Sequence, residues 1–255
     1  MGEFHCLNVG CADTSIIIDG ANTFLVDCYN IGDHSNLLPK SKSITGVFIT
    51  HQHRDHYLGL QYLKDNGYSI EYLIFSPYDR RNGDNSITLD EWNEFNSLKN
   101  HFLTKGTQTR APYRQDDFNK PWWDCGGVRF EIIGPHKDIA TSATREIHDA
   151  SLVIKTYMGE RVCLFTGDAS DTCLNKIAET TTNFCGDILH ASHHGSINGA
   201  HLEFIKKCNA QHTVVSTSSG VHDNVPHVTA LSHYKNHTAN FVRRTDVDGT
   251  WKWTF

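Results

Sequence analysis

The stretch VFITHQHRDH, residues 47–56, sets three histidines and an aspartate directly behind an apolar, β-branched segment. The apolar residues predict a buried strand that ends just before the first histidine. Because side chains alternate along an extended chain, His51 and His53 should point the same way. A turn into a helix would then let Asp55 and His56 face a neighbouring point.

Imidazole and carboxylate side chains gathered in this way are ligands that suit Zn²⁺ or Mn²⁺. The pattern therefore predicts two metal ions close together, each taking two ligands from this one segment. The alternative is a histidine-rich surface turn, which explains the H-x-H-x-D-H spacing poorly. Histidine is also abundant in the rest of the chain, with seventeen in all.

The composition is that of an ordinary globular protein. Of the 255 residues, 38% are hydrophobic and 20% are charged, and we expect one domain spanning residues 1–255. The chain begins without a basic segment followed by an apolar run, and no apolar stretch matches the thickness of a bilayer. We therefore expect a cytoplasmic protein without contact to a membrane, whose eight cysteines are reduced thiols.

The formal net charge of −6 argues against a broad basic surface for binding duplex DNA. A phosphate-bearing substrate remains compatible, because bound metal ions would change the local sign of the charge. Single strands and small nucleotides are therefore easier to accommodate than long duplexes.

Short apolar runs bounded by turn residues alternate with amphipathic segments along most of the chain. The predicted strands cover residues 6–10, 14–20, 22–28, 44–50, 70–77, 128–135, 151–159, 161–168, 212–219 and 251–255, with a strand running into a loop at 187–195. The predicted helices cover residues 57–67, 170–181, 200–210 and 227–237. Two β-rich sets with accompanying helices predict an α/β protein whose two sheets pack face to face with helices outside, an α/β/β/α sandwich.

Residues 79–125 do not follow this alternation of strands and helices, and we interpret them as an insertion on the main fold. Thr88 and Glu91 have the spacing of a capping box. Apolar residues then recur every three or four positions, which predicts a helix.

A polar and aromatic segment follows this helix. Its side chains would form a lid that stacks on bases and contacts phosphates, or would instead pack the insertion onto the sandwich. The residues concerned, taken from the whole insertion, are Arg80, Arg81, Arg110, Arg114, Tyr113, Trp122 and Trp123, with Trp92 expected to pack on the sandwich instead.

The segment HQHRDH matches the H-x-H-x-D-H signature of the metallo-β-lactamase-fold hydrolases, which are α/β/β/α sandwiches with one or two metals between the sheets. Other segments resemble one branch of them, the hydrolase domain of ComEC-type DNA-uptake channel proteins and its stand-alone relatives. These segments are VGCADTSIII (9–18), NTFLVDC (22–28), the paired strands ending in TGD (148–168), HASHHGS (190–196) and RRTDVDG (243–249). The first departs from the branch, because Cys11 and Ala12 replace a Gln-Gly pair.

The resemblance implies a ligand set for two metal ions. Its members are His51, His53 and His148 for the first ion, Asp55, His56 and His193 for the second, and Asp168 bridging both. His194 would lie close to the substrate or ligate in place of His193. Asp27 would support the histidine loop. The alternatives are an exposed loop histidine at position 148 and a helix-capping carboxylate at position 168.

The segment SSGVHDNVPHVTAL (218–231) resembles a degraded element of the same branch that retains Asn224 and His227. His227, at the start of a predicted helix, would donate a hydrogen bond to an oxyanion or a phosphate oxygen. Its alternative role is a helix cap or an exposed histidine. Asn224 and Ser196 are candidate substrate contacts.

These features predict a dinuclear hydrolase in which Zn²⁺, or alternatively Mn²⁺, holds a bridging hydroxide that attacks a phosphodiester. The expected substrates are single-stranded nucleic acid or nucleotides, and the expected catalytic residues are Asp55, Asp168, His194 and His227. No nucleophile elbow competes for the role. The alternatives are a lactone, thioester or amide hydrolase with the same site, and a non-catalytic, metal-stabilised partner subunit. A protein partner or a homo-oligomer is left open.

Overall fold

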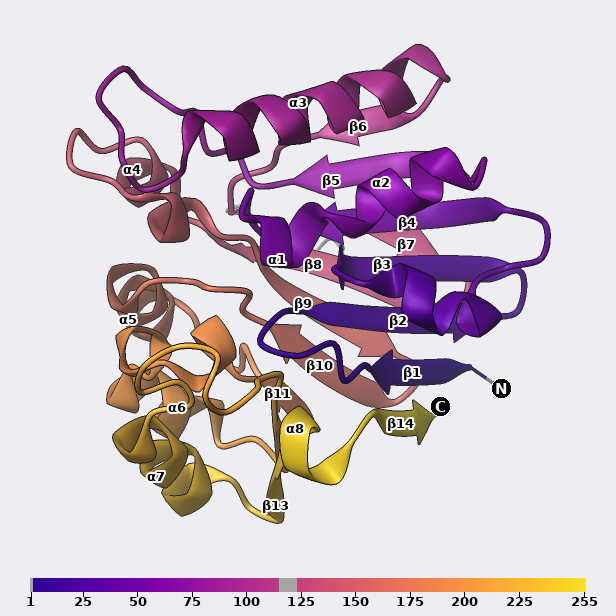
Figure 1. The fold of residues 1–255 in the computed structure, drawn as a ribbon. Helices are drawn as coiled ribbons and strands as arrows, with labels where there is room; N and C mark the ends of the chain where they lie inside the picture. The colour runs from indigo at the N-terminus through magenta and orange to yellow at the C-terminus, as the bar shows by residue number, and fades with distance from the viewer. Residues whose placement is uncertain (1, 115–122) are drawn as a thin grey trace.

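Two β-sheets lie face to face with helices on both outer sides (Figure 1). The structure is a computed structural model that describes residues 2–114 and 123–255. Within these residues each sheet has seven strands. The predicted α/β/β/α sandwich is confirmed.

The first sheet consists, in spatial order, of β14 (Trp251–Thr254), β1 (Glu3–Cys6), β2 (Thr14–Asp19), β3 (Asn22–Cys28), β4 (Ser43–Ile49), β5 (Ser69–Phe75) and β6 (Gln108–Arg110). Its helices are η1 (Ile31–Leu37), α1 (Arg54–Tyr57), α2 (Gly59–Asp65) and α3 (Leu89–Thr104). The pairs β3–β4, β4–β5 and β5–β6 are parallel, and the pairs that join β14, β1, β2 and β3 are antiparallel.

The second sheet consists, in spatial order, of β13 (Phe241–Arg244), β12 (His212–Val215), β11 (Ile188–His190), β10 (Arg161–Phe165), β9 (Val153–Met158), β8 (Val128–Gly134) and β7 (Trp123–Cys125). The helical segments around it are α4 (Lys137–Ala140), η2 (Ile147–Ala150), α5 (Asp171–Thr180), η3 (Ser192–Gly195), η4 (Ile197–Gly199), α6 (Leu202–Cys208), α7 (Val228–His237) and α8 (Thr245–Asp248). Figure 1 shows α5, α6 and α7 grouped apart from α1, α2 and α3.

Three apolar layers hold the sandwich together. The middle layer lies between the sheets, where the rings of Phe24 and Phe48 contact Phe130 at centroid distances of 5.1 and 4.5 Å. One outer layer packs α2 and α3 on the first sheet, and the other packs α5, α6 and α7 on the second. Fully burying one such side chain contributes about 1.5–3 kcal/mol to the stability of the fold. The three layers therefore hold the sheets together without needing the polar residues at the strand ends.

The predicted elements agree with the structure except at some short strands. The strand expected at 6–10 lies instead at Glu3–Cys6, and the chain then loops toward α1, where the backbone N–H of Asp13 donates to the carbonyl of Asp55 at 3.1 Å. The sequence analysis missed β6, β7 and β13, because runs of three or four residues show no clear period.

The segment 79–125 joins both sheets at its ends. Its strand β6 extends the edge of the first sheet and β7 the edge of the second. The predicted capping box is confirmed at the start of α3, where Thr88 Oγ1 accepts from the backbone N–H of Glu91 at 3.2 Å. The interpretation of residues 79–125 as an insertion stays a prediction.

The expectation of reduced thiols is wrong for one pair of cysteines. Cys185, before β11, forms a disulfide with Cys208, the last residue of α6. The two are 23 residues apart, and only the packing of α6 beside that loop brings their Cα atoms to 4.9 Å. The other cysteines, all free, are Cys6, Cys11, Cys28, Cys125, Cys163 and Cys173.

None of the helices in the described parts of the chain combines the length and the apolar character that crossing a membrane requires.

Candidate metal centre

The predicted ligands converge from four segments that are distant in sequence. The loop after β4 and helix α1 carry the H-x-H-x-D-H residues, and the turn after β10 carries Asp168. The segment η2 carries His148, and η3 carries His193 and His194. Ligand atoms from these segments lie within 4.8 Å of one another in overlapping sets of three.

Asp168 lies in the middle of this cluster, with each oxygen facing a different set of imidazoles. Its Oδ2 is 3.8 Å from His51 Nε2 and 3.9 Å from His148 Nε2. Its Oδ1 is 3.4 Å from His56 Nε2 and 3.7 Å from His194 Nε2. The side chain is 3% exposed, so this carboxylate is buried between two groups of potential ligands.

The first group consists of His51, His53 and His148. His51 Nε2 lies 3.1 Å from His53 Nδ1, and the His148 ring is 5.2 and 5.1 Å from the rings of His51 and His53, centroid to centroid. The other nitrogen of His53, Nε2, donates to the carbonyl of Ser86 at 2.9 Å. That hydrogen bond leaves Nδ1 of His53 as an acceptor that faces the group.

The second group consists of Asp55, His56 and His194. Asp55 Oδ2 is 3.3 Å from His194 Nε2 and 3.8 Å from His56 Nε2. Hydrogen bonds on the far side of each ring fix its tautomer. His56 Nδ1 donates to Asp27 Oδ2 at 2.8 Å, and His194 Nδ1 donates to the carbonyl of Ser216 at 3.1 Å. Both rings therefore direct Nε2 at the cluster, as metal-binding histidines do.

Asp27 supports the histidine loop as the resemblance implied. Its Oδ1 accepts from the backbone N–H of Thr50, and its Oδ2 accepts from the Thr50 hydroxyl, both at 2.7 Å, besides the bond to His56. Burial raises the pKa of Asp27, while the neighbouring His56 opposes that shift.

The residues present fit a bound cation. Four buried side-chain atoms of the cluster have no hydrogen-bond partner among the described residues, namely His56 Nε2, His148 Nε2, His194 Nε2 and Asp168 Oδ1. Buried polar atoms are rarely left without a partner. Ligands at about 2.0–2.2 Å around a tetrahedral metal are about 3.3–3.6 Å apart. The spacings of 3.3 Å between Asp55 Oδ2 and His194 Nε2 and of 3.4 Å between Asp168 Oδ1 and His56 Nε2 match that geometry.

Burial and neighbouring carboxylates act in opposite directions on the histidines. Burial lowers the pKa of His51 well below its ordinary value and lowers the pKa of His148 to about 3. Burial also disfavours charge on His56 and His194, but Asp168 and other carboxylates raise the pKa of both rings well above the ordinary value. His51 and His148 are therefore neutral near pH 7, and the second group lies in a field that attracts cations.

The turn that presents Asp168 requires a glycine before it. Gly167 has φ +48°, and a Cβ built there would lie 2.5 Å from the Cβ of Thr50. A side chain at position 167 would therefore press on the residue that precedes the first metal-capable histidine.

The structure separates the two histidines of the H-H-G-S element. Both have left-handed backbone conformations, with φ of 52° at each. His194 belongs to the second group, whereas His193 lies beside His148 and Asp168, with its Nε2 3.6 Å from Asp168 Oδ2. The side chain of His193 is 25% exposed and that of His194 5%. The placement thus favours the alternative in which His194, and not His193, stands beside Asp55 and His56.

The sequence analysis gave no role to Asp13, which lies beneath the second group. Its carboxylate is within 3.5 Å of His194 Nδ1, 3.7 Å of His190 Nε2 and 3.9 Å of His56 Nδ1. Burial raises the pKa of Asp13, but His190 and His194 outweigh burial and lower it. The signal available in the sequence was the VGCAD segment, in which this aspartate matches the resembling branch.

The other candidate residues from the C-terminal half have local roles. His227 is the N-cap of α7, where its Nδ1 accepts from the backbone N–H of Thr229 at 3.1 Å. No ion pair or ring contact of the described residues joins His227 to the cluster. Ser196 caps η4 in the same manner, and Asn224 is exposed in the loop before α7.

Of the residues considered for a lid, Arg81 lines a cavity that also reaches His148, whereas three others have different surroundings. The ring of Trp123 packs inside the sandwich, 5.4 Å from Phe24 and 4.8 Å from Tyr72. Arg114 donates to the carbonyl and the hydroxyl of Thr180, at the end of α5. Arg110 is exposed on β6. Trp122 lies outside the described residues.

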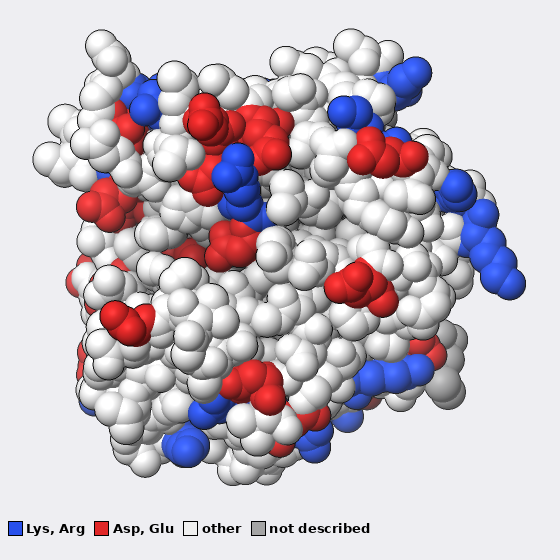
Figure 2. Space-filling view, in the orientation of Figure 1, with Lys and Arg blue, Asp and Glu red and all other residues white. Residues whose placement is uncertain are grey.

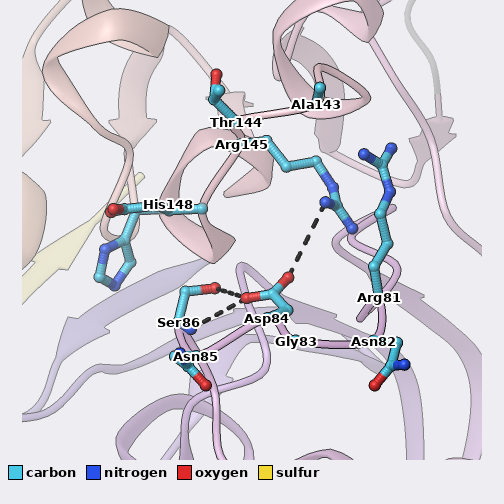
Figure 3. A pocket seen from close by; sticks show the side chains of 11 residues that line it. Arg81, Asn82, Gly83, Asp84, Asn85, Ser86, Ala143, Thr144, Arg145 and His148 are labelled. Atoms are coloured by element: carbon cyan, nitrogen blue, oxygen red, sulfur yellow. Dashed lines mark hydrogen bonds and ion pairs between the residues drawn. The ribbon is translucent and has the colours of Figure 1, made fainter.

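Two cavities open on either side of the loop that carries His148. One, of about 530 Å³, lies between residues 81–86 and 143–146, and its lining is drawn in Figure 3. The other, of about 700 Å³, lies between that loop, the start of α5 and His193. Both are lined by Thr144, Glu146 and His148, so both reach the first group.

The face of the molecule in Figure 2 carries acidic and basic side chains in small, interspersed clusters. Among its described residues no broad basic surface is visible, in keeping with the net charge of −6.

Comparison with solved structures places the chain among metallo-β-lactamase-fold proteins. The protein YhfI from Bacillus subtilis, described as having this fold, is 17% identical, with 99% of this chain and 100% of that chain covered and a TM-score of 0.59. The diiron β-hydroxylase CmlA from Streptomyces venezuelae is 14% identical at a TM-score of 0.60, with 100% of this chain and 54% of that chain covered. A diphosphatase of the PhnP family is 14% identical at a TM-score of 0.55, with 100% of this chain and 98% of that chain covered.

At these identities the likeness establishes the fold, which is the metallo-β-lactamase fold. No protein-family model matches the sequence, and no curated protein matches it.

Proposed function

We propose that this protein is a metal-dependent hydrolase that cleaves phosphodiesters and binds two divalent ions. The observation that carries the proposal is the buried carboxylate of Asp168, with one oxygen facing each of two ligand groups. A buried carboxylate in this position adds nothing to the apolar packing that holds the sandwich together. It suits a site in which two cations share one carboxylate.

The proposed ligands are the side-chain atoms that face one another in the cluster. They are His51 Nε2, His53 Nδ1 and His148 Nε2 for one ion, Asp55, His56 Nε2 and His194 Nε2 for the other, and Asp168 for both. Nitrogen-rich ligands favour Zn²⁺, and the two carboxylates leave Mn²⁺ as the alternative. When bound, such ions lower the pKa of a water molecule and polarise the oxygen of a phosphoryl or carbonyl group.

The chain's own contribution is orientation and substrate contact. Asp27 and the carbonyl of Ser216 hold the rings of His56 and His194, so the ligand atoms need no rearrangement before a cation binds. His193 is the most exposed imidazole beside Asp168, and it lines one of the two cavities. We assign to its Nε2 a hydrogen bond to a phosphate oxygen of the substrate.

The choice of a phosphodiester rests on two lines of support. The motifs of the chain resemble the ComEC-type hydrolase branch, and a structural neighbour that covers the whole chain is described as a diphosphatase. Esters and amides of carbon are the alternative substrates for the same site, and activity measurements separate the two classes.

Metal content and hydrolysis should be measured together. The wild-type protein is expected to bind two equivalents of Zn²⁺ or Mn²⁺ by elemental analysis and to hydrolyse bis(p-nitrophenyl) phosphate faster than p-nitrophenyl acetate. Asp168→Asn and His56→Ala should each lose metal and at least 100-fold in kcat/KM, the scale seen when groups that hold a metal are removed. The matched control His34→Ala changes a histidine in η1, outside the cluster, and should keep both properties.

Two results would contradict the proposal. One is a wild-type protein that binds the metals fully but turns over no phosphodiester. The other is activity that survives in Asp168→Asn, because the activity would then belong to another site or to a contaminant.

A further inference from the structure

The two cavities beside His148 differ in charge. The first, shown in Figure 3, is lined by Arg81 and Arg145, and the second has only carboxylates as its charged side chains besides histidine. In Figure 3 the guanidinium groups and the imidazole of His148 lie on opposite sides of the view. A molecule bound at the cluster therefore meets a different field on each side.

Arg81 is the unneutralised cation of the first cavity. Its Nη1 donates to the carbonyl of Ser142 at 3.0 Å, and its Nη2 donates to the carbonyl of Thr141 at 2.9 Å. Carbonyl groups fix the guanidinium in place without cancelling its charge. No salt bridge among the described residues includes Arg81. Its orientation is thus set before any ligand arrives.

Of the two carboxylates that line this cavity, Asp84 and Glu146, the first is already paired. Asp84 lies 3.9 Å from Arg145 Nη1 and accepts hydrogen bonds from the hydroxyl groups of Tyr78 and Ser86. Arg145 is buried, donates to a backbone carbonyl as well, and stacks on Tyr78 at 5.1 Å. Asp84 and Arg145 therefore balance one another, and Arg81 remains available to an anion.

The second cavity repels anions. Its acidic lining residues are Asp138, Glu146, Asp149 and Asp171, and no lysine or arginine is among its described lining residues. Glu146 also borders the first cavity, but its side chain accepts from the backbone N–H of Asp149 in a capping box. Asp138 is 3.4 Å from Lys176, whereas Asp171 takes part in no salt bridge of the described residues. Uncharged or cationic groups suit this side.

From this asymmetry, and resting on the proposed function, we propose that the substrate is a small phosphodiester with a second anionic group on one side only. The scissile phosphate lies at the cluster, the second phosphate or carboxylate lies beside Arg81, and an uncharged substituent occupies the cavity beside Asp171. A long polynucleotide fits poorly, because it carries phosphates on both sides of the bond to be cut.

Binding measurements test this without relying on turnover. The probes are thymidine 3′-phosphate, thymidine 3′,5′-bisphosphate and the dinucleotide with three phosphates, titrated by calorimetry into the metal-loaded protein. The bisphosphate should bind at least about tenfold more tightly than the monophosphate, as one charge-assisted contact gives. The dinucleotide should bind more weakly than the bisphosphate, because its third phosphate would lie beside the carboxylates of the second cavity.

Variants locate the effect. Arg81→Gln should remove the advantage of the bisphosphate and leave the affinity for the monophosphate within about twofold, a change too small to reflect a lost contact. Arg81→Lys keeps the charge and should keep part of the advantage. The matched control Arg243→Gln removes an exposed arginine from β13, at the edge of the second sheet. It should leave the affinities for both the monophosphate and the bisphosphate unchanged.

The outcomes separate this inference from the proposed function. Affinity that rises with every added phosphate, or an advantage that survives in Arg81→Gln, overturns the inference even if phosphodiesters are hydrolysed. A bisphosphate advantage that depends on Arg81 supports it, and failure of every phosphodiester to react would then overturn the proposed function alone.

Discussion

At the scale of single residues, the centre depends on groups outside the cluster that hold its side chains in place. Asp27 anchors both the Thr50 backbone and the His56 ring, and Ser216 fixes the His194 ring through its carbonyl. Gly167 is required for a further reason, since the turn before Asp168 combines a left-handed backbone with contact to Thr50. Each of these positions controls the direction in which a ligand atom points.

Replacement of Gly167 by alanine should therefore affect both stability and metal binding. The left-handed backbone costs about 1 kcal/mol or more for any other residue, and the contact with Thr50 adds about 1–3 kcal/mol of overpacking. Urea unfolding should show the combined loss, and elemental analysis should show reduced metal content. Gly20→Ala is the matched control, because φ is +59° there and nothing lies within 4 Å of the added Cβ. Equal losses in the free energy of unfolding in Gly167→Ala and Gly20→Ala would show that contact with Thr50 adds no cost.

At the scale of elements, α1 presents Asp55 and His56 because the next helix can approach β3 very closely. A Cβ built on Gly59, the first residue of α2, would lie 1.6 Å from the carbonyl oxygen of Cys28 at the end of β3. The same strand end holds Asp27, the partner of His56. The closeness of helix and strand therefore sets the distance between α1 and the rest of the cluster.

Gly59→Ala should push α1 and α2 away from β3. We expect a loss of at least about 2 kcal/mol in the free energy of unfolding, because backbone must move to relieve the clash. Of the two proposed metal ions, the one held by Asp55 and His56 should bind more weakly than the other, since His51, His53 and His148 lie outside α1. Denaturant unfolding and stepwise metal titration measure the two effects. Gln61→Ala, on the same helix, should change stability by less than about 0.5 kcal/mol, and a similar result for Gly59→Ala would contradict the explanation.

At the scale of the whole molecule, the cluster joins the two halves of the sandwich. The first sheet and its helices supply His51, His53, Asp55 and His56, and the second sheet with its loops supplies Asp168 and the remaining histidines. The apolar layer between the sheets holds the halves together, and a cation bound at the cluster would link side chains from both halves. Metal binding should therefore stabilise the fold as a unit.

Removal of metal is expected to lower the thermal midpoint of unfolding. A ligand at 100 times its Kd stabilises the native state by about 2.7 kcal/mol, so chelation should shift the Tm by several degrees. Differential scanning calorimetry with and without a chelator measures the shift, and added Zn²⁺ should restore the Tm. Asp168→Asn should unfold at the same temperature in both conditions. An unchanged Tm in the wild-type protein would show that no bound metal stabilises the fold.

The sandwich and the central part of the ligand cluster were predictable from sequence, for a local reason. Strand and helix periods repeat within a few residues, and His51, His53, Asp55 and His56 lie within six positions of one another. Their spacing alone determines which face of a strand end or a helix turn they occupy. Asp168 was named from the resemblance, which places a bridging carboxylate at the end of that strand.

Only the tertiary structure decided the features that depend on packing between distant segments. The left-handed backbone at His193 and His194 determines which ring enters the cluster, and no period in the sequence encodes it. Asp13 reaches the cluster, and Cys185 meets Cys208, because loops far apart in sequence pack together. Such contacts arise from the geometry of the assembled sheets, whereas the sequence determines directly only what neighbouring residues do to one another.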